Sequence, residues 1–331
     1  MIPLLDGRHT LPEIEAEVAE VFAPQDLEAG LQLLAEHNLL QDAGASELPE
    51  EMASRLAPQL NFFHEMEING EEMQARLRRA TVTVLGMGGA GAGAAQALAA
   101  AGVGNLRCFD AERVGQTDTY LSPIFSLADI GELRTAVVAR KISASTPEVT
   151  VATHDHFPEN DDEVLELIEG SDFVLNCLDQ GQSSLIYKLN RACLKANIAW
   201  SSCAAEGPEV VIGPTVVPFE TACYLCYKMR TVACAGNPEE EFAFETFLDR
   251  RKKDDSVRRE NLVFGVGLAA NLLSLEAVKA LSKTLSSSAP GKIIVFDLLT
   301  LDSSKHVVLR KPWCPACFKA DTEAANTASA T

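Results

Sequence analysis

Two CxxC pairs, Cys223/Cys226 and Cys314/Cys317, constrain the fold of this chain more than any other feature of its sequence. Four thiolates complete the tetrahedral coordination of one Zn²⁺ ion and leave no open position for a catalytic water. A redox dithiol pair is the alternative. However, the two CxxC pairs lie far apart in sequence, each beside a predicted sheet element, which favours a metal site that links distant segments. The sequence therefore predicts a structural zinc site with these four cysteines as ligands.

Composition limits the classes of function. The chain has 331 residues, enough for one large α/β domain and a smaller unit, and 47% of them are hydrophobic. A formal net charge of −19 disfavours nucleic-acid binding, which needs a basic surface. No basic segment followed by a long apolar one opens the chain, so we expect a cytoplasmic protein. The apolar stretch Val263–Leu281 contains Asn271 and Glu276, which predicts a buried core helix and no membrane span.

The first 45 residues predict a small helical unit. Thr10 and Glu13 have the spacing of a capping box, and Leu27, Leu31 and Leu34 repeat at helical spacing. A unit of this size is too short to be stable alone. The predicted organisation is a helical unit (1–45), a polar linker (46–58), a large α/β domain (59–318) with a charged insertion near 228–260, and a disordered tail (319–331).

A glycine-rich turn opens the large domain, with the sequence Thr-Val-Thr-Val-Leu-Gly-Met-Gly-Gly-Ala-Gly over residues 81–91. It follows an apolar strand, precedes an Ala-rich helix, and Asp110 ends the next predicted strand. Backbone N–H groups at a helix N-terminus bind phosphate, and a carboxylate about twenty residues later binds ribose hydroxyls. A tight strand–helix joint without a ligand is the alternative interpretation. NAD binding fits poorly, because the C-terminal half offers no hydride-transfer residues.

Strand and helix segments alternate after this turn, which predicts βαβ units and a doubly wound, Rossmann-like, mostly parallel sheet. The predicted strands are Val82–Leu85, Leu106–Asp110, Val149–Thr153, Phe173–Cys177, Ile198–Ser201, Ile293–Asp297 and His306–Leu309. The predicted helices are Gly91–Ala101, Leu133–Ser143, Asp162–Glu169 and Ser183–Ala196.

Several of these segments together resemble the ThiF/MoeB family of ubiquitin-activating-enzyme-like adenylyltransferases, over about Asn61 to Phe318. The resemblance rests on Gly86-Met87-Gly88-Gly89-Ala90-Gly91, Ala101–Gly104, Phe109-Asp110, Asp129-Ile130-Gly131, Leu175–Asp179 and both CxxC pairs. It implies that Gly86, Gly88, Gly89 and Gly91 cradle ATP. It further implies that Asp110 holds the ribose, Asp179 binds Mg²⁺ and Arg134 contacts phosphate. Members of the family join AMP to a C-terminal carboxylate of a substrate protein.

Two departures from that family pattern concern its arginines. The segment that supplies an arginine to the phosphates aligns with Asp118–Ser122, where Asp118 stands at the family's asparagine position and Leu121 at the arginine position. The segment that supplies an arginine finger across the dimer aligns with Gln59–Phe63, which contains no arginine. Adenylyl transfer needs cations to stabilise charge on the transferring phosphate. The sequence therefore predicts a vestigial nucleotide site with no catalytic residues and at most weak ATP/Mg²⁺ binding.

The N-terminal run from Leu4-Leu5-Asp6-Gly7 to Asn38-Leu39-Leu40 resembles the helical part of a winged-helix leader-peptide recognition domain. Together with a degenerate ThiF-like domain, it is similar to the precursor-binding partner of YcaO-type azoline (thiazole/oxazole) cyclodehydratases. The pairing strands that usually open such a winged helix are not seen before Leu4. The resemblance implies binding of a precursor leader peptide, a YcaO-type partner that performs the ATP chemistry, and a homodimer.

Two classes of function stay open at this point, and the sequence favours the first. One is a non-catalytic, leader-binding scaffold subunit of a cyclodehydratase that converts Cys, Ser and Thr to azolines. The other is an ATP-dependent adenylyltransferase acting on the C-terminal carboxylate of a sulfur-carrier protein or small peptide. Cys234 is either a thioester nucleophile, as in some relatives, or a loop residue without a nearby histidine. For His154 and His156 a solvated loop is favoured over a metal site.

Overall fold

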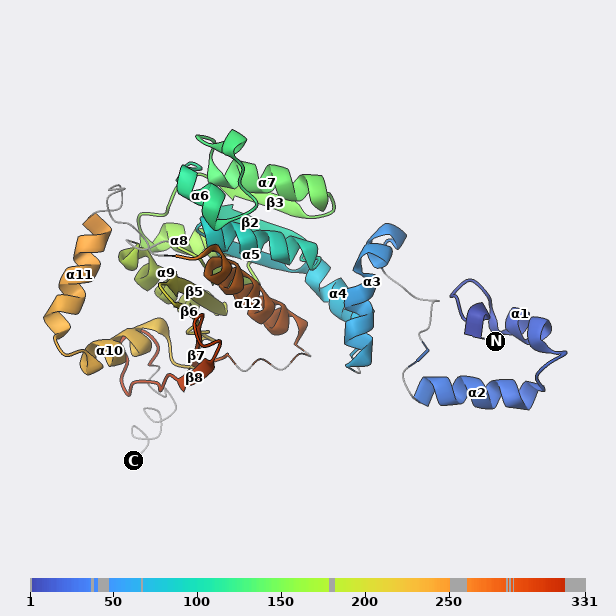
Figure 1. Ribbon diagram of the computed structural model, residues 1–331. Coiled ribbons are helices and arrows are strands. Elements are labelled where there is room, and N and C mark those ends of the chain that lie inside the picture. Colours follow the sequence, from blue (N-terminus) through green and yellow to red (C-terminus); the bar gives the residue numbers. More distant parts are fainter. Residues whose placement is uncertain are drawn as a thin grey trace, which may run out of the picture. The chain divides into compact units, whose positions relative to one another are not determined.

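The computed structural model divides the chain into two compact units, Met1–Arg76 and Leu77–Thr331, whose elements are labelled in Figure 1. The structure describes residues 2–36, 39–40, 48–66, 68–178, 182–250, 261–283, 285, 287 and 289–318. The proposed magnesium ligand Asp179, residues 251–260 of the charged insertion and the predicted tail 319–331 lie outside the described residues.

Short helices build the first part of the N-terminal unit: η1 (Ile2–Leu4), a 3₁₀ helix, then α1 (Leu11–Val18) and α2 (Pro24–Glu36). The predicted capping box is confirmed, because the Glu13 carboxylate accepts a hydrogen bond of 2.7 Å from the backbone N–H of Thr10. Ile14, Val18 and Leu27 bury their side chains against one another. In the described part of this unit there are helices and no strands.

The predicted linker 46–58 is largely helical. Helix α3 (Glu50–Glu65) runs through its second half, and α4 (Gly70–Arg79) follows. Met52, Leu56 and Leu60, four residues apart, pack with Leu48 into a buried cluster. That spacing places them on one face of a helix, so apolar burial outweighs the polar composition that suggested a linker. The boundaries predicted for the domains themselves stay a prediction.

One sheet of eight strands forms the centre of the C-terminal unit, in the order β3-β2-β1-β4-β5-β6-β7-β8. Strands β3 to β5 pair in parallel, and the pairs from β5 to β8 are antiparallel. The predicted doubly wound, mostly parallel sheet is therefore confirmed. The strands are β1 (Thr81–Leu85), β2 (Asn105–Phe109), β3 (Thr150–His154), β4 (Phe173–Asn176), β5 (Trp200–Glu206), β6 (Glu209–Ile212), β7 (Lys292–Asp297) and β8 (Ser303–Val307).

Helices cover both faces of this sheet (Figure 1): α5 contacts α7 and α12, while α8 contacts α9, which in turn contacts α10 and α11. Right-handed crossovers between parallel strands produce this two-sided arrangement. The helices are α5 (Gly89–Ala100), α6 (Gln116–Leu121), the 3₁₀ helix η3 (Leu127–Asp129), α7 (Arg134–Ser145), α8 (Asp161–Ile168), α9 (Ser183–Ala196), α10 (Tyr224–Cys234), α11 (Pro238–Arg250) and α12 (Val263–Ser282).

Among the described residues, α12 is the one helix long and apolar enough to cross a membrane by length and composition. Half of this apolar stretch is buried inside the protein. The helix lies against α5 and against strands β4, β5 and β6. Ala270 and Leu273 are buried on this side, and Ser274 donates a hydrogen bond of 3.3 Å to the carbonyl of Ala94 in α5. The predicted core helix is confirmed.

Candidate functional site

The glycine turn lies where β1 ends and α5 begins, and β1 has β2 on one side and β4 on the other. Chain connections leave in opposite directions from this point of the sheet, which is where open α/β folds bind ligands. Gly86 has a φ of +85°, and a Cβ on it would lie 2.5 Å from the carbonyl oxygen of Cys177. A Cβ on Gly91 would lie 1.8 Å from the Gly86 carbonyl oxygen. Only glycine fits at these two positions.

We expect Gly91→Ala to destabilise the chain by about 3 kcal/mol, because the new methyl group forces the turn apart. Urea denaturation followed by circular dichroism measures this loss. Gly267→Ala is the matched control, since that glycine is also helical and a Cβ on it meets nothing within 4 Å. The control should be as stable as the wild type or more so, because alanine favours helix. Equal stability of Gly91→Ala and the wild type would contradict the crowding at the turn.

Asp110 follows β2 and ties the glycine turn to that strand. One carboxylate oxygen accepts a hydrogen bond of 2.6 Å from the backbone N–H of Met87, and the other accepts one of 2.7 Å from Glu112. The side chain is buried, at 2% exposure. The residue that the family resemblance assigns to ribose binding therefore lies directly beside the turn assigned to the phosphates.

Arg134, at the start of α7, lies between two carboxylates. Its Nε and Nη2 donate to the two oxygens of Asp118, at 3.0 and 2.9 Å, and its Nη1 lies 3.4 Å from Asp110. The arginine side chain is 14% exposed and that of Asp118 is 6% exposed. A bidentate pair with so little solvent is a strong charge-assisted contact. The proposed phosphate ligand is thus engaged by the acid that replaces the family's asparagine.

The other two cations of α7 are also paired. Lys141 Nζ lies 2.7 Å from one oxygen of Asp129, and Arg140 Nη2 lies 2.7 Å from the other. The hydrogen bond from Lys141, together with that from Ser126, holds the pKa of Asp129 well below its usual range. The Asp129-Ile130-Gly131 motif therefore has a structural role: it fixes the segment that leads into Arg134.

Apolar side chains lie over the N-terminus of α5. A Cβ built on Gly89, in the first turn of the helix, would lie 2.8 Å from Cγ1 of Val266 and 2.9 Å from Cβ of Leu121. Leu121 stands at the position where the family has an arginine for the phosphates. The structure brings this residue to the glycine turn, as the alignment of the motifs predicted, and places an uncharged group there.

Asn176 is a site residue that the sequence analysis did not single out. It is the last residue of β4, pairs with Leu85 across the sheet, and is 3% exposed. Its Oδ1 atom is buried without a hydrogen-bond partner among the described residues. Buried polar groups nearly always have a partner, so this oxygen indicates a polar ligand or water at the switch point. An asparagine closing an otherwise apolar strand was the signal available in the sequence.

The four CxxC cysteines come together in the buried interior. Their sulfur atoms all lie within 4.8 Å of one another. The Sγ–Sγ distances are 3.9 Å for Cys223–Cys226, 3.8 Å for Cys223–Cys314 and 3.5 Å for Cys226–Cys317. Tetrahedral Zn–S bonds of about 2.3 Å place sulfurs about 3.8 Å apart, so the donor set and its dimensions fit a structural zinc. The four predicted cysteines thus form one cluster, compatible with structural zinc, that joins the start of α10 to the segment after β8.

The other cysteines and histidines that the structure describes form no comparable cluster. Within the described part of the chain, the four CxxC residues are the one group with the geometry to hold a metal ion. Cys108, Cys177 and Cys193 are buried, Cys203 is partly buried, and Cys234 is exposed at the last position of α10. His154 ends β3 and stacks on Phe109 with ring centroids 4.2 Å apart. Its pKa is lowered by burial and by the neighbouring His156.

A glycine turn at the switch point, a buried acid after β2 and a four-cysteine cluster that fits zinc together define a Rossmann-like α/β domain. The model of the ThiF family matches residues 58–316, and the chain belongs to this family. The curated relatives include a molybdopterin-synthase adenylyltransferase of Salmonella typhimurium, 26% identical over 65% of this chain and 78% of the relative. A sulfur carrier protein adenylyltransferase of Thermus thermophilus is 26% identical over 77% of this chain and 88% of the relative.

Solved structures with the same fold cover more of the chain than the family model does. Escherichia coli MccB in complex with MccA-N7isoASN has a TM-score of 0.71 at 21% identity, covering 90% of this chain and 83% of MccB. PaaA has a TM-score of 0.72 at 20% identity, covering 94% of this chain and 89% of PaaA. At these identities the likeness concerns the fold alone.

Proposed function

We propose that this chain binds ATP at the glycine turn and transfers AMP to the C-terminal carboxylate of a peptide or small carrier protein. The observation that carries the proposal is the glycine turn itself, with Gly86 and Gly91 crowded against backbone and the Asp110 carboxylate beside it. The activity named for the curated relatives, adenylyl transfer, supports it. So does the MccB fold, whose solved structures include complexes with ATP and with MccA.

Adenylyl transfer requires the protein to bind the phosphates, to bind the ribose and to stabilise the transferring phosphate. A carboxylate oxygen of the substrate attacks the α-phosphorus of ATP, the bond to the β-phosphate oxygen breaks, and pyrophosphate leaves with its electron pair. Backbone N–H groups at the start of α5 would bind the phosphates, and Asp110 would accept hydrogen bonds from the ribose hydroxyls. Arg134 would stabilise the transferring phosphate, for which its guanidinium must exchange Asp118 for phosphate oxygens.

The pair between Arg134 and Asp118 favours a second candidate function. With Leu121 at the arginine position and Arg134 held by two carboxylates, the site is short of cations. A protein of this design would serve as a leader-binding subunit for a YcaO-type cyclodehydratase, which performs the ATP chemistry itself. The N-terminal unit, with its two short amphipathic helices, would then hold the precursor peptide. In either case we also propose a homodimer, from the family resemblance.

ATP–pyrophosphate exchange separates the two candidates. Purified chain is incubated with Mg-ATP, labelled pyrophosphate and the small proteins or precursor peptides encoded beside its gene. The adenylyltransferase proposal expects substrate-dependent exchange that Asp110→Ala abolishes and that Asp155→Ala, a control on an exposed loop, leaves intact. No exchange with any of these substrates contradicts it. If cyclisation by a YcaO-type partner is then crippled by deleting residues 1–45 and unaffected by Asp179→Ala, the second candidate replaces the first.

A further inference from the structure

Helix α11 packs on the protein through its acidic face. Glu241, Glu245 and Asp249 are four residues apart and therefore share one side of the helix. Lys228 Nζ, on α10, lies 2.5 Å from Glu245 and 3.5 Å from Glu241. Burial alone lowers the pKa of Lys228, but the two carboxylates outweigh that effect and raise it above its ordinary value. Charge pairing, without apolar burial, thus holds the N-terminal half of α11 on α10.

The C-terminal half of α11 is attached to the start of α9. The Asp249 carboxylate accepts hydrogen bonds from the backbone N–H groups of Ser183, at 2.9 Å, and Ser184, at 3.3 Å. Gln182, the residue before α9, makes no side-chain cap of its own, so an acid from another helix supplies the cap. Helix α9 begins a few residues after β4 ends, so this contact places the end of α11 at the edge of the sheet that carries the glycine turn.

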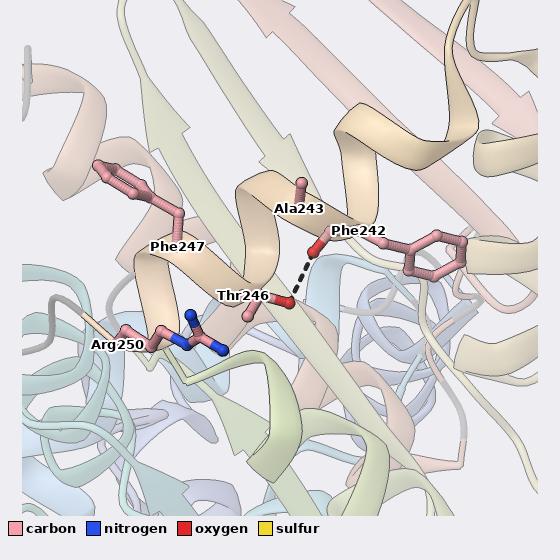
Figure 2. Close-up of a pocket in the computed structure, with 5 residues that line it drawn as sticks. All are labelled: Phe242, Ala243, Thr246, Phe247 and Arg250. Carbon is pink, nitrogen blue, oxygen red and sulfur yellow. Dashed lines mark hydrogen bonds between the residues drawn. The ribbon is translucent and has the colours of Figure 1, made fainter.

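The rest of the surface of α11 is exposed and carries phenylalanines that point to different sides of the helix. Phe242, Ala243, Thr246, Phe247 and Arg250 line an open groove of about 540 Å³, and Figure 2 shows them along one stretch of the helix. Phe242 is 53% exposed and Phe247 is 44% exposed, and none of the described residues of α11 is buried. Helix α11 turns its acidic residues toward the protein and its phenylalanines toward solvent. Exposed apolar patches of this kind indicate a binding surface.

Charge along the helix gives the groove a direction. Glu239, Glu240 and Glu241 stand in its first turn, and Arg250 stands at its last residue. Within the described part of the chain the Arg250 guanidinium pairs with no carboxylate. An extended ligand with an anionic end therefore fits with that end at Arg250, which is also the end beside α9. The nine residues of helix from Phe242 to Arg250 span about 12 Å, the length of about four extended residues.

We propose that this groove binds the last four or so residues of the substrate peptide, with apolar side chains on Phe242 and Phe247 and the terminal carboxylate near Arg250. This inference rests on the proposed function and narrows it to substrates whose C-terminal tail is apolar. Binding in this direction delivers the carboxylate to the edge of the sheet where the glycine turn lies. The acidic first turn of α11 repels a carboxylate placed the other way round.

Fluorescence anisotropy without nucleotide tests the groove. The probes are a fluorescein-labelled octapeptide ending in Leu-Gly-Phe with a free carboxylate, its C-terminal amide, and a version with serine at both apolar positions. We expect the wild type to bind the first probe about tenfold more tightly than either of the others, from the loss of a charged hydrogen bond or of apolar burial. Phe242→Ala/Phe247→Ala should bind it about tenfold more weakly, and Arg250→Gln should lose the preference for carboxylate over amide.

Two matched variants control for general effects. Phe264→Ala removes another exposed phenylalanine, 79% exposed on α12, and Lys195→Gln removes another exposed cation; both should bind like the wild type. Absence of binding by the wild type, or unchanged binding by the groove variants, overturns the proposal. A groove variant that turns a dimer into a monomer in light scattering also overturns it, in favour of a second copy. Exchange activity is measured separately, so that failure of the groove leaves the proposed adenylyl transfer standing, and failure of exchange leaves the binding result intact.

Discussion

Replacing Cys314 with serine is expected to unfold much of the C-terminal unit and to release about one zinc ion per chain. Serine is a poor zinc ligand, and the four sulfurs join segments that have no other covalent link. A structural zinc site contributes roughly 10–16 kcal/mol to folding, as much as or more than the roughly 5–15 kcal/mol total stability of an ordinary domain. Metal analysis, circular dichroism and thermal denaturation of the purified variant measure the loss.

The matched control for that variant is Cys234→Ser. Cys234 is exposed at the end of α10 and lies outside the cluster, so its replacement should leave zinc content and melting temperature unchanged. Chelation of wild-type protein should reproduce the effect of Cys314→Ser, because both remove the same ion. A wild-type chain that is folded and free of zinc after purification without chelator would refute the assignment.

The parallel half of the sheet could be predicted because local pattern and burial agree there. Strands β1 and β4 are buried over almost their whole length. Their sequences are therefore largely apolar, which predicts buried strands. Gly86 and Gly91 mark the turn because no other residue fits. The cysteine cluster was predictable for a different reason. Each CxxC spacing brings two ligands together locally, and two such pairs supply the four thiolates of one zinc site.

Other features depend on contacts that a single sequence does not contain. The helix over residues 50–58 was not predicted, because Met52 and Leu56 look isolated among charges until the helix brings them together. The inward acidic face of α11 depends on Lys228 of the preceding helix and on the N-terminus of α9, which is far away in sequence. The bidentate contact between Asp118 and Arg134 likewise joins two segments whose proximity follows only from the fold.

That contact determines how the site responds to mutation. In the present arrangement Asp118 neutralises the guanidinium that would otherwise face phosphate, and Leu121 contributes no charge. A carboxylate held close to the phosphates also repels them directly. Under the proposed adenylyl transfer, nucleotide binding would have to break the pair; under the scaffold alternative, the pair keeps the site inactive. In both cases Asp118, Leu121 and Arg134 control adenylyl transfer. The two cases differ in whether the wild type is active.

Asp118→Asn combined with Leu121→Arg is therefore expected to raise ATP–pyrophosphate exchange by about 10²- to 10³-fold, since one well-placed cation or hydrogen-bond donor at a transferring phosphate contributes that much or more. The uncharged amide introduced by Asp118→Asn would no longer hold Arg134 by charge, and the new arginine would lie beside Gly89. Arg134→Ala in this background should return exchange to the wild-type level or below. Asp162→Asn with Leu299→Arg makes matched changes at exposed positions outside the glycine turn and its contacts and should have no effect. If the folded, zinc-bound site variant shows no increase in exchange, a shortage of cations is not what limits adenylyl transfer at the glycine turn.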